Sequence, residues 1–345
     1  MVSKSGSIIL ISLGLFGLIS VYGIAQTEPP SVPTGYQLTY QFQSGETLKY
    51  KITTKGAGSM SIRESDKSYY GLMTAISLPI TTQSQSMVTM NVRSVTPEGI
   101  AEIETKVASM NSREEILGHA LIEKYTNGIY ECYADDVLEF TSVTTNKPIP
   151  FLINPIAYKI DNRGKQFAFA EMKWLNQYTP DLDDGLYFMD FNDMVLFAEP
   201  GLPAYQLHPG DSWAATTDLK IPKLKIKPIK VVIESSLSSI DTVNGSPYAV
   251  IENFWNVDIS DWKFDLLKLK EFEDILPNIK LKRMQEMISG KSYHLLNKGK
   301  VTKGEYIQNY IMELSVKPPK MSQHSDFEAL FTIYLADNVT IELVE

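Results

Sequence analysis

The feature that most constrains the fold is a strict alternation of apolar and polar residues, which recurs along the chain. The segment SMVTMNVRSV (86–95) places Val88, Met90 and Val92 on one side of an extended chain. The next segment, IAEIETKVASM (100–110), does the same with Ile103 and Val107. Successive side chains of a strand point to opposite faces. The pattern therefore predicts antiparallel strands with one buried face.

Turn signals separate these alternating segments. TPEG (96–99) stands between the two segments just described, and Asn-Gly pairs stand at 127–128 and 244–245. Asn-Gly favours a two-residue hairpin turn, because a type I′ turn needs positive φ at both positions. Asn297 to Gly299 and the pair Asp337-Asn338 predict two further turns. The 18 Tyr and 14 Phe of the chain also favour strands.

Two similar segments lie far apart in the sequence. Residues 40–53 read YQFQSGETLKYKIT, and residues 205–218 read YQLHPGDSWAATTD. In each, a glycine permits a tight turn and the following acid stays at a solvated turn before a strand. We expect an all-β fold with minor α content, made of two related antiparallel units over 39–145 and 205–345. Each unit is sandwich-like or half-barrel-like.

Two segments depart from the β pattern. Residues 146–204 are rich in proline and predict an irregular connection between the units. Residues 261–289 predict a helical insertion in the second unit, because apolar residues recur there at helical spacing. Its first helix ends near Pro277, and Gly290 closes a second, short helix that contains Met284 and Ile288. The apolar residues of the first helix are Trp262, Leu266, Leu269, Phe272 and Leu276.

The first residues have the three-part pattern of a secretory signal. Lys4 precedes an uncharged run from Ile8 to Ala25, and the small residues Gly23 and Ala25 suit a cleavage before Gln26. We expect residues 1–25 to be a signal peptide and 26–38 a disordered N-terminus. An uncleaved membrane anchor is the alternative, because the run is nearly long enough to span a bilayer. The expected location is the periplasm or the cell surface.

Composition excludes some classes of protein. The net charge of −9 argues against binding to nucleic acid, which needs a basic field. Cys132 is the only cysteine, so it forms no intramolecular disulfide and is expected to be a small buried apolar residue. A large exported chain without disulfides suits a bacterial envelope better than an animal secretion.

No motif predicts catalysis. The four histidines, His119, His208, His294 and His324, lack metal-ligand spacing. The sequence has neither a nucleophile elbow nor a phosphate-binding loop. We therefore expect no catalytic residue, no metal and no cofactor.

Two charged runs each allow two interpretations. The acidic run DLDDGLYFMDFND (181–193) is either a weak calcium site or a solvated turn. The run KIPKLKIKPIK (220–230) is either a contact for anionic lipid or polysaccharide, or an edge strand protected by lysine and proline.

The aromatic residues provide the remaining functional signal. If the sheet curves, inward-facing residues line an apolar cavity beside the helical insertion. The candidate ligand-binding residues are Trp213, Trp255, Trp262 and Phe272. Core packing explains the same residues without a ligand. We expect a non-catalytic exported protein that binds a lipid or another apolar, envelope-derived ligand. The alternative is a structural or interaction module that contacts other envelope proteins.

The strand starts carry a resemblance to a protein family. SGETLKYKIT, HPGDSW and VNGSPYAVIE resemble a group of uncharacterised exported bacterial β-proteins with repeated Pro-Gly-x-x-(Leu/Trp) strand starts. Ser44 stands where that group usually has proline. The resemblance implies export and a β fold, and it brings no catalytic residue. The matching residues are Gly45, Leu48, Tyr50, Gly210, Asp211, Trp213, Asn244 and Gly245.

Overall fold

The protein is all-β. The computed structural model describes residues 35–64, 76–145, 155–169, 201–219, 229–258, 279–316 and 329–344. Within these ranges one helical turn, α1 (Ser142–Thr145), accompanies the strands. The strands are β1 (Thr47–Glu64), β2 (Ile76–Val95), β3 (Ala101–Ile116), β4 (His119–Thr126), β5 (Ile129–Ala134), β6 (Val137–Thr141), β7 (Ile156–Ile160), β8 (Gln166–Phe169), β9 (Ser212–Leu219), β10 (Ile229–Val243), β11 (Ser246–Asp258), β12 (Ile279–Leu295), β13 (Lys300–Val316) and β14 (Ala329–Leu343).

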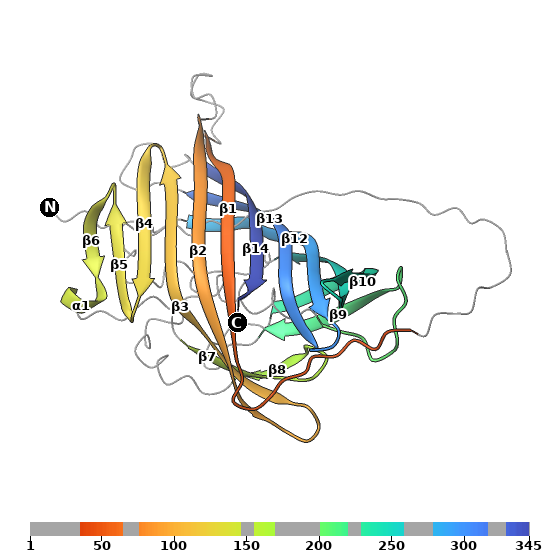
Figure 1. Ribbon diagram of the computed structural model, residues 1–345. Helices are drawn as coiled ribbons and strands as arrows, with labels where there is room; N and C mark the ends of the chain where they lie inside the picture. The colour runs from red at the N-terminus through yellow and green to blue at the C-terminus, as the bar shows by residue number, and fades with distance from the viewer. Residues whose placement is uncertain are drawn as a thin grey trace, which may run out of the picture.

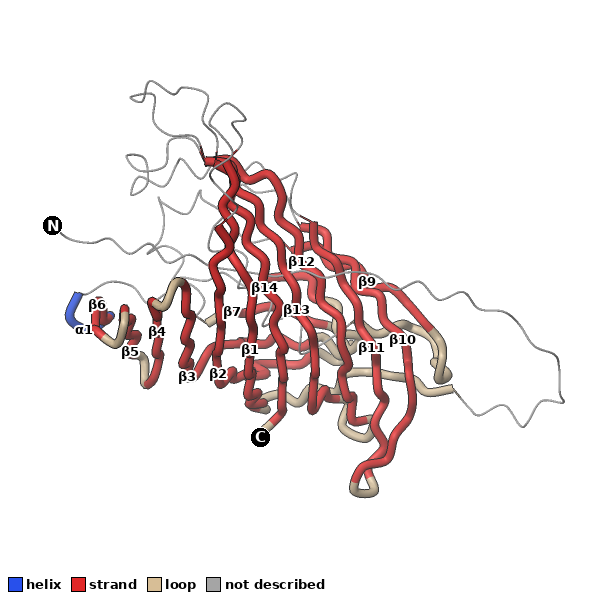
Figure 2. Tube along the Cα trace, turned by 90° about the horizontal axis from the view of Figure 1, so that it is seen from above, coloured by secondary structure: helices blue, strands red, loops and turns tan. Residues whose placement is uncertain are grey.

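All these strands belong to one antiparallel sheet. Its order is β6-β5-β4-β3-β2-β1-β14-β13-β12-β11-β10-β9, and β7 pairs with β3 and β8 off this path. Figure 1 shows a strongly twisted layer with β4–β6 towards one edge and β9 and β10 towards the other. Figure 2, from above, shows the central strands side by side in the same layer. The first and last strands, β1 and β14, are neighbours in the middle of the sheet.

Most of the predicted turns are confirmed. Asn127 and Gly128 have φ values of 54° and 81°, and Asn244 and Gly245 have 50° and 78°. Both pairs connect neighbouring strands, as a type I′ turn requires. The residues 96–100 and 296–299 also connect neighbouring strands, β2 to β3 and β12 to β13.

The predicted turn at Asp337-Asn338 is wrong. Strand β14 continues through it, and Asp337 pairs with Gly56 on one side and Gln308 on the other. No glycine follows Asn338 to supply the second left-handed residue of a type I′ turn. Leu335, Asp337 and Val339 all face the same side of the sheet and are buried, so the strand period continues across the pair. Pairing with β1 and β13 therefore keeps residues 337–338 extended.

The second half of the predicted helical insertion is also wrong, because residues 279–289 belong to β12. Met284 and Ile288 do lie on one face, with Glu286 between them, and all three are buried. A spacing of four places residues on one face of a helix and also on one face of a strand. The buried residue between them, Glu286, is acidic, so the apolar-polar alternation of a strand could not be recognised in the sequence. The first half, residues 261–278, lies outside the described residues.

Several other predicted segments fall partly or wholly outside the described ranges. They are the N-terminal 34 residues, the acidic run and residues 220–228 of the basic run. The connection 146–204 is not wholly irregular, because it contains β7 and β8. Four of the five residues of β7 are buried, although its sequence, IAYKI, does not alternate between apolar and polar residues.

The two similar segments have matching backbone geometry. Gly45 and Gly210 have φ values of 81° and 97°. The Gly45 amide donates to the Val92 carbonyl (2.8 Å), and the Gly210 amide donates to the Leu237 carbonyl (2.7 Å). In return the Val92 amide donates to the Glu46 carbonyl, and the Leu237 amide donates to the Asp211 carbonyl, both at 2.9 Å. The register shifts directly after Val92 in β2 and after Leu237 in β10.

The segments that precede β1 and β9 contact each other. Tyr36 and Leu207 form an antiparallel bridge, with reciprocal amide-to-carbonyl bonds of 2.7 and 2.9 Å. Leu38, Trp213 and Leu237 belong to one apolar cluster beside this bridge. The two halves of the chain therefore share a sheet and a core at this end.

Candidate functional site

The two tryptophans that the structure describes lie in the core. Trp213 in β9 is buried, and its Nε1–H donates to the Gly201 carbonyl oxygen at 2.7 Å. Trp255 in β11 is buried against Tyr306, with ring centroids 5.7 Å apart. We call the face that carries Trp255 the inner face and the opposite one the outer face. The other two candidates, Trp262 and Phe272, lie outside the described residues.

The middle of the inner face is closed to solvent. Strands β1, β2, β3, β12, β13 and β14 contribute large apolar side chains there, each at most 4% exposed. Core packing accounts for these side chains, and the indole of Trp255 lies among them. They include Tyr50, Val88, Met90, Ile103, Ile288, Tyr306, Tyr310, Leu335 and Ile341.

Polar groups inside this core are paired. The Ser235 hydroxyl donates to Asn253 Oδ1 at 2.8 Å, and Asn253 Nδ2 donates to Ser292 Oγ at 3.0 Å. Burial raises the pKa of the nearby Tyr306 phenol and keeps it neutral, although its bonds to Ser292 and Asn253 act in the opposite direction. A satisfied buried network of this kind fixes the register of its strands.

A band of buried and partly buried polar groups crosses the inner face beside that network. Gln308 Nε2 donates to Glu286 Oε1 at 2.6 Å, and Thr82 Oγ1 donates to Asp337 Oδ1 at 2.7 Å. The second bond crosses β1 above Gly56, where an added Cβ would lie 1.5 Å from Asp337 Oδ1. The absence of a side chain at Gly56 therefore lets the carboxylate reach a strand that is not its neighbour.

Beyond this band, the inner face becomes apolar and accessible. Leu314, Phe331 and Ile62 form one cross-strand row, and Met312, Ile333, Met60 and Leu78 form the next. All except Ile333 are partly buried, whereas Ile80 and Leu335 in the adjoining row are buried. We call these six partly buried residues the apolar end: Met60, Ile62, Leu78, Met312, Leu314 and Phe331. Two of them, Met60 and Ile62, belong to the C-terminal end of β1, which is the upper end of this strand in Figure 1.

The apolar end has the chemistry of a site for an apolar ligand. None of its six side chains is charged, and two are methionines, whose flexible thioethers adapt to different shapes. A contiguous accessible apolar patch on a folded protein commonly marks an interaction site. Sequence reasoning missed it because its residues belong to β1, β2, β13 and β14, which come together only through long-range strand pairing.

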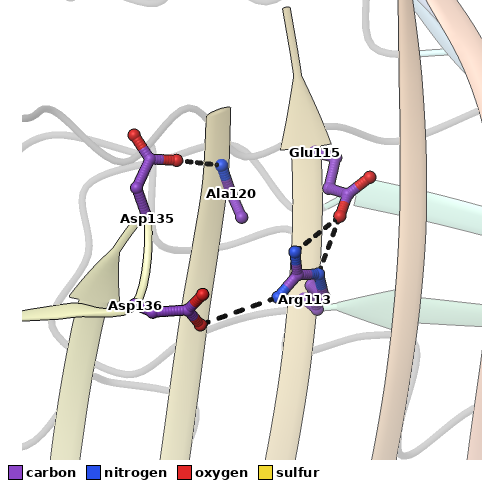
Figure 3. A network of polar contacts seen from close by, with 5 residues as sticks. All are labelled: Arg113, Glu115, Ala120, Asp135 and Asp136. Carbon is purple, nitrogen blue, oxygen red and sulfur yellow. Dashed lines mark hydrogen bonds and ion pairs between the residues drawn. The ribbon is translucent and has the colours of Figure 1, made fainter. Parts of the chain in front are cut away.

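Two of the histidines take part in surface turns. His119 Nδ1 lies 2.7 Å from Asp135 Oδ2, and the Ala120 amide donates to Asp135 Oδ1 at 2.8 Å. The bond from His119 and the bond from this amide lower the pKa of the Asp135 carboxyl. Arg113 pairs with Glu115 in the neighbouring network shown in Figure 3. His208 lies next to Asp211 in the turn before β9, and His324 lies outside the described residues.

His294 in β12 is completely buried. Its Nε2 lies 3.2 Å from the Thr39 carbonyl oxygen, so this nitrogen carries the hydrogen and donates. Its Nδ1 has no hydrogen-bond partner, and the Tyr40 ring packs edge-on at 5.2 Å. Burial lowers the His294 pKa from 6.5 to about 4. The neutral imidazole therefore holds the segment before β1 against the sheet.

The remaining candidate groups give no sign of a reactive centre. Cys132 is partly buried beside Tyr130, and desolvation raises the pKa of its thiol, which disfavours the nucleophilic thiolate. Among the described residues, no three metal-ligating side chains gather in one place. In the same part of the chain, no helix has the length and apolarity required to cross a bilayer.

Comparison with known proteins gives no indication of function, so the proposal below rests on the chemistry of the site. The sequence matches no model of a known protein family and none of the curated proteins searched.

Proposed function

We propose that this is a non-catalytic, exported protein that binds an apolar ligand at the apolar end of its sheet. The observation that carries the proposal is the pair of cross-strand rows whose side chains are apolar and, except for that of Ile333, only partly buried. Covering each of these side chains adds on the order of 1 kcal/mol to binding, since burial of apolar surface is favourable in proportion to area. A lipid chain, or another envelope-derived apolar molecule, has the required chemistry.

The rest of the proposal concerns export and architecture. The pattern in residues 1–25 supports a secretory signal, as in the group that the strand starts resemble. The matching bonds and register shifts at Gly45 and Gly210 support two related β units placed in succession along one sheet. In this arrangement β1 of the first unit lies directly beside β14 of the second unit in the sheet.

The alternative is a structural or interaction module of the envelope. It is favoured by the apolar residues exposed around edge strand β6, where Val137 and Leu138 are 62% and 49% exposed. An edge strand with apolar side chains is a ready surface for another protein. Native mass spectrometry of the purified protein separates the two functions. A co-purifying lipid-sized mass supports the carrier, and an apo mass with self-association supports the module.

Neighbouring residues on opposite faces of β1 provide the test by mutation. Ile62 belongs to the apolar end, whereas Ser61 lies on the outer face. We expect Ile62→Glu to weaken binding of the neutral fluorophore N-phenyl-1-naphthylamine about tenfold or more, because a buried carboxylate is costly. Ser61→Glu adds the same charge and should leave binding unchanged. Equal binding by wild type and Ile62→Glu would rule out the apolar end as the site.

A further inference from the structure

A second surface, on the outer face, has a different chemistry. A groove of about 740 Å³ crosses four strands, from β9 to β12. Ser212, Ser236, Glu252 and Lys291 pair across the strands as one row of its lining, and Ala214, Glu234, Phe254 and Ser289 pair as the other. The rows come from the side chains that alternate with buried Trp213, Ser235 and Asn253. The groove therefore opens on the outer face, away from the apolar end.

The floor of the groove is main chain. Trp213, Ser235, Asn253 and Gly290 pair in register between the two rows, and the first three direct their side chains inwards. Small residues at 212, 214, 236 and 289 keep the walls low. Three strand spacings give the groove a length of roughly 14 Å. It is therefore a shallow groove that runs across the strands.

The ladders exclude one kind of occupant. In the described part of the chain, β10, β11 and β12 each pair with a neighbour on both sides, and of these four strands only β9 ends the sheet order. A strand added at that edge would run along β9 and not across the groove. An extended peptide bound by strand addition needs free main-chain groups at a sheet edge. Because the groove crosses the strands, its ligand must be recognised by side chains.

The lining side chains suit a polyol. Three serine hydroxyls, the Glu234 carboxylate and the Glu252–Lys291 ion pair (3.0 Å) can donate to or accept from hydroxyl groups. Phe254 is 39% exposed at the groove and offers an apolar ring face to C–H groups. Two carboxylates against one ammonium disfavour an anion, and the hydroxyls and charges disfavour a purely apolar molecule.

We propose that this outer groove binds a neutral saccharide chain of the flat, β-linked type. Such a chain presents C–H groups on its faces, which pack on Phe254, and hydroxyl groups at its edges, which reach the serines and Glu234. Its flat, extended shape matches a shallow groove that crosses the strands. This site is independent of the apolar end, because it lies on the opposite face.

Isothermal titration calorimetry of the full chain tests the proposal with β-1,4-linked tetrasaccharides of glucose and of N-acetylglucosamine. We expect at least one of them to bind, and Phe254→Ala to weaken that binding about tenfold or more. Tyr334→Ala is the matched control, because Tyr334 is also an outer-face aromatic and is also 39% exposed. It should bind as the wild type does.

A second variant protects the test against misfolding. Glu234→Gln changes one exposed side chain of the groove and is expected to weaken binding severalfold while leaving the thermal midpoint unchanged. Binding of the neutral chain should also be insensitive to salt. The proposal is overturned if neither tetrasaccharide binds at millimolar concentration. Binding that both Phe254→Ala and Glu234→Gln leave unchanged overturns it equally.

Discussion

At the scale of single residues, the folded state depends on titratable side chains that are buried in their uncharged form. His294 is the clearest case, because it is buried as a neutral imidazole with one nitrogen bonded to the Thr39 carbonyl. An unfolded chain places no such restriction on the ring. The difference in pKa between the two states links protonation of this ring to stability.

The first prediction concerns this linkage. The folded pKa of about 4 lies below the ordinary histidine pKa of 6.5, so the unfolded state binds the proton more readily. The stability due to the neutral ring is present above pH 6.5 and is lost as the pH falls towards 4. The pKa difference corresponds to about 3 kcal/mol. Denaturant unfolding at several pH values should show this loss in the wild type.

His294→Leu provides the comparison. Its free energy of unfolding should fall less steeply between pH 6.5 and pH 4, because its only change is the loss of a titrating side chain and its Thr39 bond. Other groups that titrate in this range affect both proteins alike. Parallel curves for the two proteins would contradict the linkage.

At the scale of secondary-structure elements, the strand starts before β1 and β9 are the most informative. Gly45 and Gly210 adopt left-handed conformations, and no atom lies within 4 Å of the position where a Cβ would be added to either. A substitution there is therefore strained by the backbone alone. This makes the two sites directly comparable.

The second prediction uses this comparison. Gly45→Ala and Gly210→Ala should each lower the free energy of unfolding by about 1 kcal/mol, because alanine disfavours positive φ. Gly45→Asn and Gly210→Asn should cost less, since asparagine tolerates this conformation. Chemical denaturation measures all four variants. If alanine and asparagine cost the same, the backbone conformation is not the cause.

The elements also show how far sequence reasoning extends. The all-β class and the turns at Asn127-Gly128 and Asn244-Gly245 were predictable, because local alternation and turn chemistry determine them. Strand β12 was not, because buried Glu286 interrupts its apolar pattern. The apolar end was not predictable either, since its rows join β1, β2, β13 and β14 only through long-range pairing.

At the scale of the whole molecule, a single sheet makes every central strand depend on its neighbours. Strand β14 lies between β1 and β13 and pairs with both along its length. Its inner-face residues Ile333 and Leu335 also belong to an apolar cluster that includes Ile80 of β2. Removal of β14 therefore exposes two long edges and part of the core.

The third prediction is that a chain ending at residue 328 does not form a stable monomer. Unpaired central edges and uncovered apolar residues favour association with other chains. Size-exclusion chromatography should show aggregates or no soluble protein. A chain ending at residue 343, which keeps the whole of β14, serves as the control and should elute as the full chain does. A soluble monomeric chain without β14 would contradict the prediction.

The pairing of β1 with β14 also affects synthesis of the protein. Tyr50 pairs with Leu343, so β1 forms its second ladder only after β14, far later in the chain, has been synthesised. Contacts of such high sequence separation form slowly, and incomplete sheets expose edges that other chains can join. The nascent chain should therefore need a holding chaperone until β14 has been synthesised, and a protease should cleave it more readily before that point than after.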